Sequence, residues 1–462
     1  MSLPLLSPFE ARTLLKHTTS RCPVCHQLCP AEVFRSAGNQ VILERTCPIH
    51  GKASVCIASD ARFYWLAKGD PSNAGGCCSS NDKTCCAGDR SPAGTLGRNA
   101  EGKGDGPFEK LSTCLALIEV VDSCNLACPT CYADSPMGVA HKIKAPSLSE
   151  IKTRIQGILD RKGKIEILQL SGGEPTLHPE FFELLEWARD NPGIDYLLLN
   201  TNGVRIAHEP GFAERLGALF PKTGLQLYLQ FDGVQTDGQQ ALRGADLRST
   251  REKAIARCGA ANIPVTLAMT VTEANLPHLW EAIDFGLRFP QVHGITFQPM
   301  FGSGRTPADI SPRRRLNTAD IILAAVSQSG GKLRVQDFTP LPCGDPNCAT
   351  MGYLVRAQGR TWSISEFLDF SQLQGFLKDK IHYTLEDLAK CGCENEPLGQ
   401  LLKDLEIKSS MVFRMMVKPF MDAWTWDEDR IDRCCTHVIR PDGKLDSFCR
   451  YYSGFPDTKA AP

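Results

Sequence analysis

Six short apolar segments alternate with helix-like segments between residues 113 and 300, and this alternation restricts the fold more than any other feature of the chain. The first segment, "CLALIEVV", is almost unbroken in its apolar residues from Leu115 to Val121, as is typical of a strand buried on both faces. The others are "IEILQLSGG", "YLLLNTNG", "LQLYLQFDG", "IPVTLAMTV" and "GITFQP". Helices are expected between them, over residues 147–162, 179–190, 209–219, 248–260 and 276–288. This order predicts an α/β fold with a parallel sheet and helices outside it.

The loops after these strands carry polar residues and glycines. Three cysteines follow the first strand in "CNLACPTC", at gaps of three and then two residues: Cys124, Cys128 and Cys131. The loop "SGGEP" after the second strand contributes Gly172, Gly173 and Glu174. The other candidates end the third, fourth and sixth strands, where short polar side chains could equally form turns: Asn200, Asn202, Asp232 and Gln298. Parallel sheets bind ligands at this end of their strands, so we expect these residues to share one site.

Cysteine is unusually frequent in this chain. It accounts for 21 of 462 residues in an otherwise ordinary composition, with 42% hydrophobic residues and a formal net charge of -1. Dense disulfides belong mostly to small exported domains, so clustered cysteines in a long chain indicate metal ions or iron–sulfur clusters. Cys114 and Cys258 lie among apolar or small residues, and we expect them to be packed thiols.

Residues 1–70 form a cysteine-rich head with two turns typical of metal sites. Cys22 and Cys25 form the first turn in "RCPVC", and Cys47 opens the second in "ERTCPIHG". Residues 31–45 between them are expected to form a hairpin that turns at residues 38–39. Thiolates at tetrahedral spacing bind zinc or iron, so the head resembles a zinc ribbon or a rubredoxin. The sequence leaves three candidates for the fourth ligand: His50, Cys56 and Cys29.

The remaining cysteines lie in a linker and in a C-terminal region. Residues 71–112 are rich in Gly, Ser and Asp and are expected to be a linker or an irregular insert. Its cysteines could hold a second cluster or form a thiol loop: Cys77, Cys78, Cys85 and Cys86. Residues 301–462 are expected to cap the sheet and to hold an auxiliary cluster through Cys343, Cys348, Cys435 and Cys449. Adjacent side chains diverge in extended backbone, so one of Cys434 and Cys435 is expected to bind and the other to pack.

Two further patterns in the C-terminal region allow a binding role or a structural one. The basic run Arg313, Arg314 and Arg315 could bind a phosphate-bearing substrate or form a solvated helix start. The aromatic residues of "FMDAWTWD" could line an apolar pocket or belong to the core: Phe420, Trp424 and Trp426.

The motifs of residues 113–300 resemble those of the radical S-adenosylmethionine (SAM) superfamily. The resemblance rests on "CNLACPTC" after the first strand and "SGGEP" after the second, supported by "NTNG" and "QFDG" after the third and fourth. It implies a partial (β/α)6 TIM-like barrel in which Cys124, Cys128 and Cys131 hold a [4Fe–4S] cluster and leave one iron open for SAM. Reductive cleavage of SAM would give a 5′-deoxyadenosyl radical that removes hydrogen from an inert C–H bond. The chain departs from the family at Thr130, where an aromatic residue is usual, and has Tyr132 after the third cysteine instead.

The same resemblance gives roles to the other strand-end residues. Gly172 and Gly173 would let the backbone approach the methionine amino group of SAM, and Glu174 would support their loop. The polar side chains of Asn200, Asn202 and Asp232 would contact the ribose or the carboxylate of SAM. Gln298, on the sixth strand, would be a further contact.

Taken together, the head, the first strand and "FQP…TPLPC" resemble the archaeal tetraether lipid synthases and their bacterial relatives. This implies C–C bond formation or alkylation of a lipid, with methylation of a pterin-like small molecule as the alternative. A low-potential electron donor such as ferredoxin or flavodoxin is implied as a partner. A non-catalytic iron–sulfur electron carrier is the alternative of another class, but a carrier gains nothing from an open iron. A zinc-ribbon nucleic-acid binder would fit the head alone.

Charge and hydropathy exclude two further classes of partner. The net charge of -1 offers no basic surface for nucleic acid. No run of about 18 apolar residues is present, so no transmembrane segment is expected. The first residues lack the basic and apolar regions of a signal peptide, and we therefore expect a cytoplasmic protein.

Overall fold

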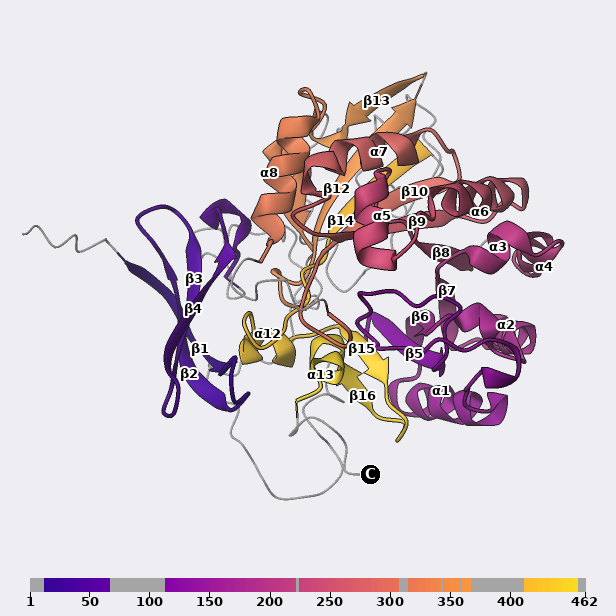
Figure 1. Cartoon of the computed structure of the whole chain (residues 1–462), viewed down its shortest axis with the longest axis horizontal. Helices are drawn as coiled ribbons and strands as arrows, with labels where there is room; N and C mark the ends of the chain where they lie inside the picture. The colour runs from indigo at the N-terminus through magenta and orange to yellow at the C-terminus, as the bar shows by residue number, and fades with distance from the viewer. Residues whose placement is uncertain are drawn as a thin grey trace, which may run out of the picture.

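The computed structural model describes residues 12–66, 113–221, 224–306, 315–341, 344–357, 359–366 and 411–455 (Figure 1). The predicted linker and the cysteines at 343, 391 and 393 lie outside these ranges, as do Arg313 and Arg314. The described part of the chain forms a large mixed sheet with helices around it and a separate small sheet at the N-terminus (Figure 1).

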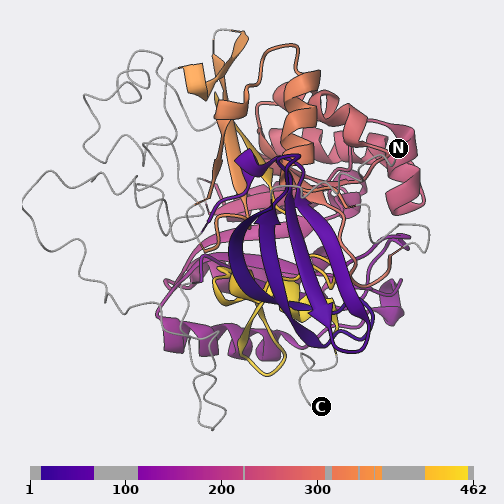
Figure 2. The same cartoon turned by 90° about the vertical axis from the view of Figure 1, so that its left-hand side faces the viewer.

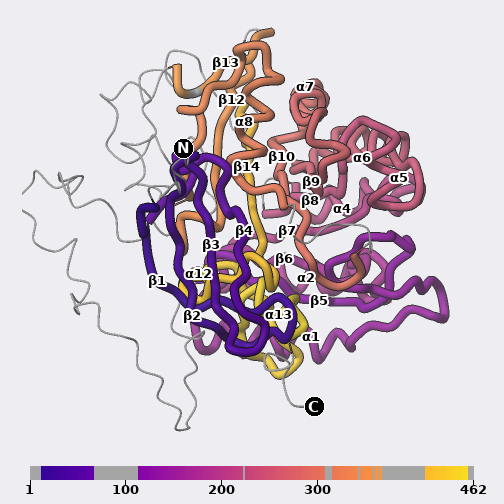
Figure 3. Tube along the Cα trace, turned by 60° about the vertical axis from the view of Figure 1, so that its left-hand side comes forward, coloured from indigo at the N-terminus to yellow at the C-terminus, as the bar shows by residue number. Residues whose placement is uncertain are grey.

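The centre of the large sheet consists of the six strands that the sequence predicts. They run parallel in sequence order, and Figure 3 shows them side by side: β5 (Leu115–Val121), β6 (Ile165–Gly172), β7 (Ile194–Thr201), β8 (Leu225–Gln230), β9 (Val265–Val271) and β10 (Val292–Pro299). Their apolar side chains form the main core together with the inner faces of the surrounding helices. The predicted partial (β/α)6 barrel is confirmed.

Helices connect these strands on the outside of the sheet (Figure 1). They are α1 (Leu148–Lys162), α2 (Phe181–Asp190), α3 (Val204–His208), α4 (Phe212–Leu219), α5 (Thr236–Arg243), α6 (Arg248–Ala260) and α7 (Leu279–Leu287). Helix α1 begins as predicted, because the Ser147 hydroxyl accepts a hydrogen bond from the Glu150 backbone at 3.2 Å. Two short helices, α3 and α5, were not predicted. Helix α5 spans only eight residues, is largely polar and has Gly238 in its interior, which lowers its helix propensity.

The C-terminal region extends this sheet at both edges. Strand β14 (Val412–Val417) runs parallel to β10, and β15 (Thr436–Ile439) runs parallel to β5. At the first edge, β12 (Thr350–Ala357) pairs antiparallel with β14, and β11 (Phe338–Pro340) and β13 (Arg360–Ser363) pair antiparallel with β12. At the other edge, β16 (Leu445–Ser447) pairs antiparallel with β15. Three helices complete the region: α8 (Thr318–Gln328), α12 (Glu428–Asp432) and α13 (Phe448–Ser453). The region predicted as a cap thus contributes walls to the barrel.

The head is a four-stranded antiparallel sheet beside the C-terminal elements (Figure 2). Its strands are β1 (Thr13–Arg21), β2 (Leu28–Arg35), β3 (Val41–Cys47) and β4 (Gly51–Ala58). The predicted hairpin is β2–β3, and Asn39 in its turn has a φ of 59°. Ion pairs fix the head on α12, since Lys16 Nζ lies 2.7 Å from Asp427 and 3.0 Å from Asp429.

Short 3₁₀ turns link these elements: η1 (Ala61–Phe63), η4 (Ala140–Lys142), η5 (Pro175–Leu177), η6 (Leu276–His278), η7 (Val335–Asp337) and η8 (Ile364–Glu366). The helix predicted from residue 276 therefore starts as a 3₁₀ turn and continues as α7. None of the helices in the described ranges is long and apolar enough to cross a membrane.

Candidate active site

A cavity of about 210 Å³ lies inside the barrel and opens at the carboxyl ends of the parallel strands. The structure brings most of the predicted site residues together on its wall: Cys124, Cys128, Cys131, Gly172, Gly173, Asn200, Asn202 and Gln298. Glu174 and Asp232 do not line it. The prediction that these strand ends share one site therefore applies to eight of the ten residues.

The loop that carries the three cysteines is fixed by backbone hydrogen bonds at both ends. The amide of Cys124 donates to Pro136 at 2.9 Å, and Cys131 exchanges two hydrogen bonds of 2.9 Å with Arg305. Burial raises the pKa of Cys124 to about 12 and also raises that of Cys128, which favours the protonated thiols. Iron would displace these protons, because it binds thiolates. Three soft donors at the open end of a cavity fit a cluster with one open iron.

Gly172 and Gly173 are required by the backbone of the neighbouring strand. A Cβ on Gly172 would lie 2.2 Å from the Val121 carbonyl oxygen, and one on Gly173 would lie 2.1 Å from the Ser123 carbonyl oxygen. Gly172 also has a φ of 119°, which side chains other than glycine rarely adopt. The glycines were expected to make room for SAM. In the structure they let the end of β6 pack directly against the segment that leads into the cysteine loop.

Glu174 connects the loop after β6 with the loop after β7. Its buried carboxylate accepts hydrogen bonds from the hydroxyls of Thr176 and Thr201, both at 2.7 Å, and from the Asn202 backbone at 2.7 Å. Burial raises the pKa of this carboxyl group, and the hydrogen bonds oppose that rise. Glu174 therefore positions Asn202, which lines the cavity.

Asn200, Asn202 and Tyr132 form the polar part of the wall next to the cysteines. The Asn202 amide donates to Asn125 at 2.6 Å and lies 3.8 Å from Cys124 Sγ. The Asn200 amide donates to Ser171 at 3.1 Å and to the Tyr132 hydroxyl at 3.4 Å. Sequence reasoning noted Tyr132 only as a displaced aromatic residue. Its position directly after the third cysteine was the signal that it would face the site.

Asp232 forms a buried ion pair with Arg243. Two hydrogen bonds of 2.6 and 2.9 Å join the groups, and the side chains are 0% and 9% exposed. Arg243 also donates to the Thr130 carbonyl at 3.3 Å. Burial raises the pKa of Cys128, and the positive charge of Arg243 partly offsets this rise. The Asp232 carboxylate was expected to contact the ribose or carboxylate of SAM. It is instead occupied by Arg243, a residue that the sequence did not single out.

The cavity has two chemically different walls. Strands β5 to β7 contribute mainly apolar side chains, which are Leu115, Leu117, Ile167, Tyr196 and Leu198, together with the amides of Gln169 and Asn200. Strands β8 to β10 contribute amides and hydroxyls, in which Gln226 donates to Thr266 at 2.6 Å and Gln298 donates to Tyr228 at 3.0 Å. Strand β14 adds Arg414, and Lys418 follows directly after it.

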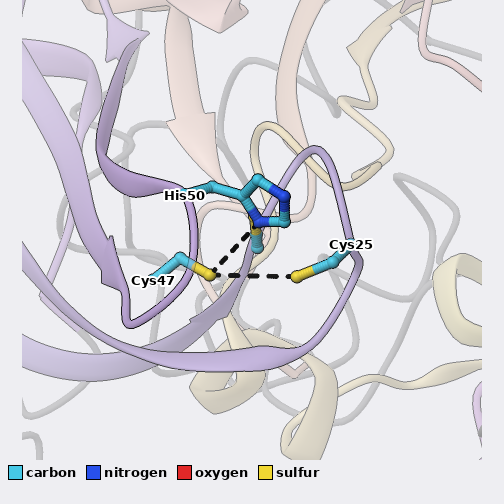
Figure 4. A group of neighbouring side chains, drawn as sticks. Cys25, Cys47 and His50 are labelled. Atoms are coloured by element: carbon cyan, nitrogen blue, oxygen red, sulfur yellow. Dashed lines mark hydrogen bonds between the residues drawn. The ribbon is translucent and has the colours of Figure 1, made fainter.

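A second candidate site lies in the head, where two turns bring four ligand atoms together (Figure 4). The atoms belong to Cys22, Cys25, Cys47 and His50 and all lie within 4.8 Å of one another. His50 Nδ1 is 3.6 Å from the sulfurs of both Cys22 and Cys47. Burial raises the pKa of Cys47, but backbone N–H groups and His50 outweigh this and lower it to about 6, which favours the thiolate. The geometry thus selects His50 among the three candidates for the fourth ligand.

The other two candidates lie outside this group. Cys56 lines a small separate cavity between the head and the core. Cys29 packs against the sulfurs of Cys22 and Cys47, but its thiol donates to the Gln27 carbonyl at 3.4 Å. Burial raises the pKa of Cys29 to about 11, so it favours the protonated form.

We expect His50→Ala to weaken metal binding in the head of the full-length chain by at least about 100-fold. Loss of even an outer-shell partner costs roughly 10–100-fold in metal affinity, and His50 would be a direct ligand. Competition with a chromophoric chelator measures the change, with Cys29→Ala and Cys56→Ala as matched controls. A larger loss in either control than in His50→Ala would contradict this ligand set.

A third group of thiols lies in the C-terminal region, near Lys418. Burial raises the pKa of Cys435 to about 12 and that of Cys449 to about 11, and the charges of Cys348 and Lys418 act on both. Burial also raises the pKa of Cys434, whose neighbours include the same thiols. A Cβ on Gly344 would lie 3.3 Å from Cys435 Sγ, so the chain next to position 343 reaches this group. The predicted ligands at 348, 435 and 449 are therefore neighbours.

Several other expectations have structural outcomes. Cys114 is disulfide-bonded, so the prediction of a packed thiol is wrong, whereas Cys258 is a fully buried free thiol. Arg315 forms an ion pair with Asp422. Of the three aromatic residues, Phe420 lines the cavity, Trp426 is buried, and Trp424 packs on the core of the head.

Comparison with known proteins gives two family matches. The model of the radical SAM superfamily matches residues 118–286, and the model of the HMPTM N-terminal zinc ribbon domain matches residues 14–59. The chain is 26% identical to 7,8-dihydro-6-hydroxymethylpterin dimethyltransferase of Methanocaldococcus jannaschii, over 94% of this chain and 93% of the relative. It is 28% identical to the mycofactocin maturase MftC of Mycobacterium tuberculosis, over 42% of this chain and 47% of that protein. Among solved structures, anSMEcpe with bound AdoMet and Cp18Cys peptide matches with a TM-score of 0.35 and 17% identity, over 62% of this chain and 88% of that chain.

Proposed function

Residues 118–286 form a radical SAM domain, which makes the chain a radical SAM enzyme, and we propose that it methylates a small polar heterocycle of the pterin type. One observation carries the choice of substrate: the cavity combines a largely apolar wall with a wall rich in amides and hydroxyls. A planar heterocycle fits both, because its face is apolar and its edges carry hydrogen-bond donors and acceptors. The end-to-end similarity to a pterin dimethyltransferase supports the same substrate class.

A lipid chain, which the sequence suggested first, fits this cavity less well. The side-chain amide group of a glutamine has two N–H donors. Gln226 donates one of them to Thr266, and Gln298 donates one to Tyr228, which leaves a second donor on each for a substrate. Buried amide groups that face a hydrocarbon chain would stay unpaired, at a cost of roughly 1–3 kcal/mol each.

Cys124, Cys128 and Cys131 would hold the cluster, and Asn200, Asn202 and the Gly172–Gly173 loop would bind SAM beside it. When bound, the [4Fe–4S] cluster supplies the electron that cleaves SAM reductively. The chain's own contribution is positional. Glu174 fixes the loop of Asn202, Arg243 fixes Thr130 between the second and third cysteines, and the buried walls exclude water from the reacting carbon.

The other metal sites are part of the proposal. A Cys₃His set suits a zinc or iron ion in the head. An auxiliary [4Fe–4S] cluster would be held by four thiols. They are Cys343, Cys348, Cys449 and either Cys434 or Cys435. A low-potential donor such as ferredoxin or flavodoxin would supply electrons. Free thiols in such number favour a reducing compartment, and we place the enzyme in the cytoplasm.

Anaerobically reconstituted enzyme with SAM and reductant is expected to add methyl groups to 6-hydroxymethyl-7,8-dihydropterin, detected by mass spectrometry. Gln298→Leu should lower kcat/KM about fivefold, since one lost hydrogen bond is worth roughly 1 kcal/mol and each 1.4 kcal/mol is tenfold. Release of 5′-deoxyadenosine without a methylated pterin, or methylation of lipid acyl chains instead, would refute the substrate class.

A further inference from the structure

The charges around the cavity are unbalanced. Among the described residues that line it, four are cationic and none is a carboxylate; the cations are Arg243, Arg305, Arg414 and Lys418. Arg243 is neutralised by Asp232, and Arg305 lies 3.0 Å from Asp134. Arg414 and Lys418 differ from these, because neither has a carboxylate partner in the described part of the chain.

Arg414 and Lys418 occupy different depths of the cavity. Arg414 pairs in register with Gly294, near the start of β10 and at the floor of the barrel. Lys418 follows the end of β14, where it donates to the Thr436 hydroxyl at 3.0 Å near the C-terminal thiols. Residues four apart in a strand are separated by about 13 Å, so a compact group on the floor would contact Arg414 alone.

The floor around Arg414 lacks any compensating negative charge in the described structure. Burial raises the pKa values of Tyr196 and Tyr228 to about 12, and in both cases the Arg414 charge opposes the rise. Burial lowers the pKa of His293 to about 4, and Arg356 and Arg414 lower it further. These neighbours are neutral at pH 7, so they do not offset the guanidinium. A half-buried cation without a counter-ion is costly unless a ligand supplies the negative charge.

We propose that Arg414 binds an anionic group of the substrate, a carboxylate or a phosphate, at the floor of the barrel. The proposal rests on the proposed function and makes it more specific, since it assigns a charge to one end of the heterocycle. The planar guanidinium matches either group through two parallel hydrogen bonds. An anion held there lies at the opposite end of the cavity from Cys124, Cys128 and Cys131, whose thiolates would repel it. The uncharged end of the substrate then points to the cysteine loop.

Calorimetric titration of the reconstituted full-length enzyme with inorganic pyrophosphate tests the anion site without assuming a pterin. We expect Arg414→Gln to weaken pyrophosphate binding at least tenfold and Arg414→Lys to weaken it less, because lysine keeps the charge but not the fork. Lys418→Gln is the matched control, since it removes the same charge from a residue just after the strand that carries Arg414. Equal weakening in Arg414→Gln and Lys418→Gln, or no weakening in either, would overturn the proposal.

Two further titrations separate this proposal from its rivals. SAM should bind Arg414→Gln within twofold of its affinity for the unaltered enzyme, and a parallel loss of SAM binding would mean that Arg414 serves the SAM carboxylate instead. Pterin-6-carboxylate should bind more tightly than 6-hydroxymethylpterin, and Arg414→Gln should remove that preference. If neither pterin binds but pyrophosphate binding still depends on Arg414, the pterin assignment fails and the anion site stands.

Discussion

Replacing Cys124, Cys128 and Cys131 with alanine is expected to reduce the release of 5′-deoxyadenosine from SAM by at least about 1,000-fold, which corresponds to roughly 4 kcal/mol of activation free energy. The three thiols lie together at the open end of the cavity, and no other described cysteine lines that cavity. Without them the cluster has no protein ligands at this end, and SAM loses the iron that would bind and reduce it. Anaerobic turnover with dithionite, followed by chromatography, measures the release.

Cys258→Ala is the matched control, because it removes a buried free thiol from α6, away from the cavity. It should leave both the iron content and SAM cleavage close to those of the unaltered enzyme. Iron analysis of the triple variant also tests the C-terminal thiols: the content should stay well above one iron per chain if they hold an auxiliary cluster. SAM cleavage that survives the triple substitution would refute the assignment of the active site.

Arg243→Met is expected to destabilise the fold by about 3–5 kcal/mol, because it leaves the Asp232 carboxylate buried without its partner. The double variant Asp232→Asn/Arg243→Met should lose less, since it removes both charges and asparagine tolerates the φ of 61° at position 232. Thermal melting of the three proteins measures the difference. The single variant should also hold less iron, because Arg243 fixes the Thr130 carbonyl beside Cys131.

A single variant that melts at the same temperature as the double variant would contradict this role. Arg248→Met provides the control for loss of an arginine. Arg248 pairs with Asp246 at 2.7 Å on the surface, where an ion pair contributes less than about 1 kcal/mol. Its melting temperature should therefore change little.

The barrel strands could be predicted because each is a short segment rich in apolar residues that local sequence reveals, and β5 is almost continuously apolar. Strands β14 and β15 could not, because their parallel partners lie far away in the chain: β15 pairs with β5, more than 300 residues earlier. The same limit applies to the site. The spacing of the three cysteines predicts a cluster from a few neighbouring residues. A binding role for Arg414 can be inferred only from the structure, in which β14 places this residue beside β10.

The ion pair of Asp232 shows the same limit. An aspartate at a strand end is a reasonable ligand for a hydroxyl-bearing cofactor until its partner is known. The partner, Arg243, is the last residue of α5, a short and largely polar helix that was not predicted. The head shows the converse, because its three ligand candidates were all visible in the sequence and needed only distances to select His50.

The placement of β14 and β15 has a consequence for the order of events during synthesis. The barrel strands β5 to β10 leave the ribosome before β14 and β15, so both outer edges of that sheet stay unpaired until residues 412–439 have followed. Unpaired edges are aggregation-prone, and long-range parallel pairing is slow. A nascent chain would thus need a chaperone at these edges, and iron delivered before the C-terminal strands dock would meet an unfinished barrel. Cluster insertion is therefore expected to be post-translational.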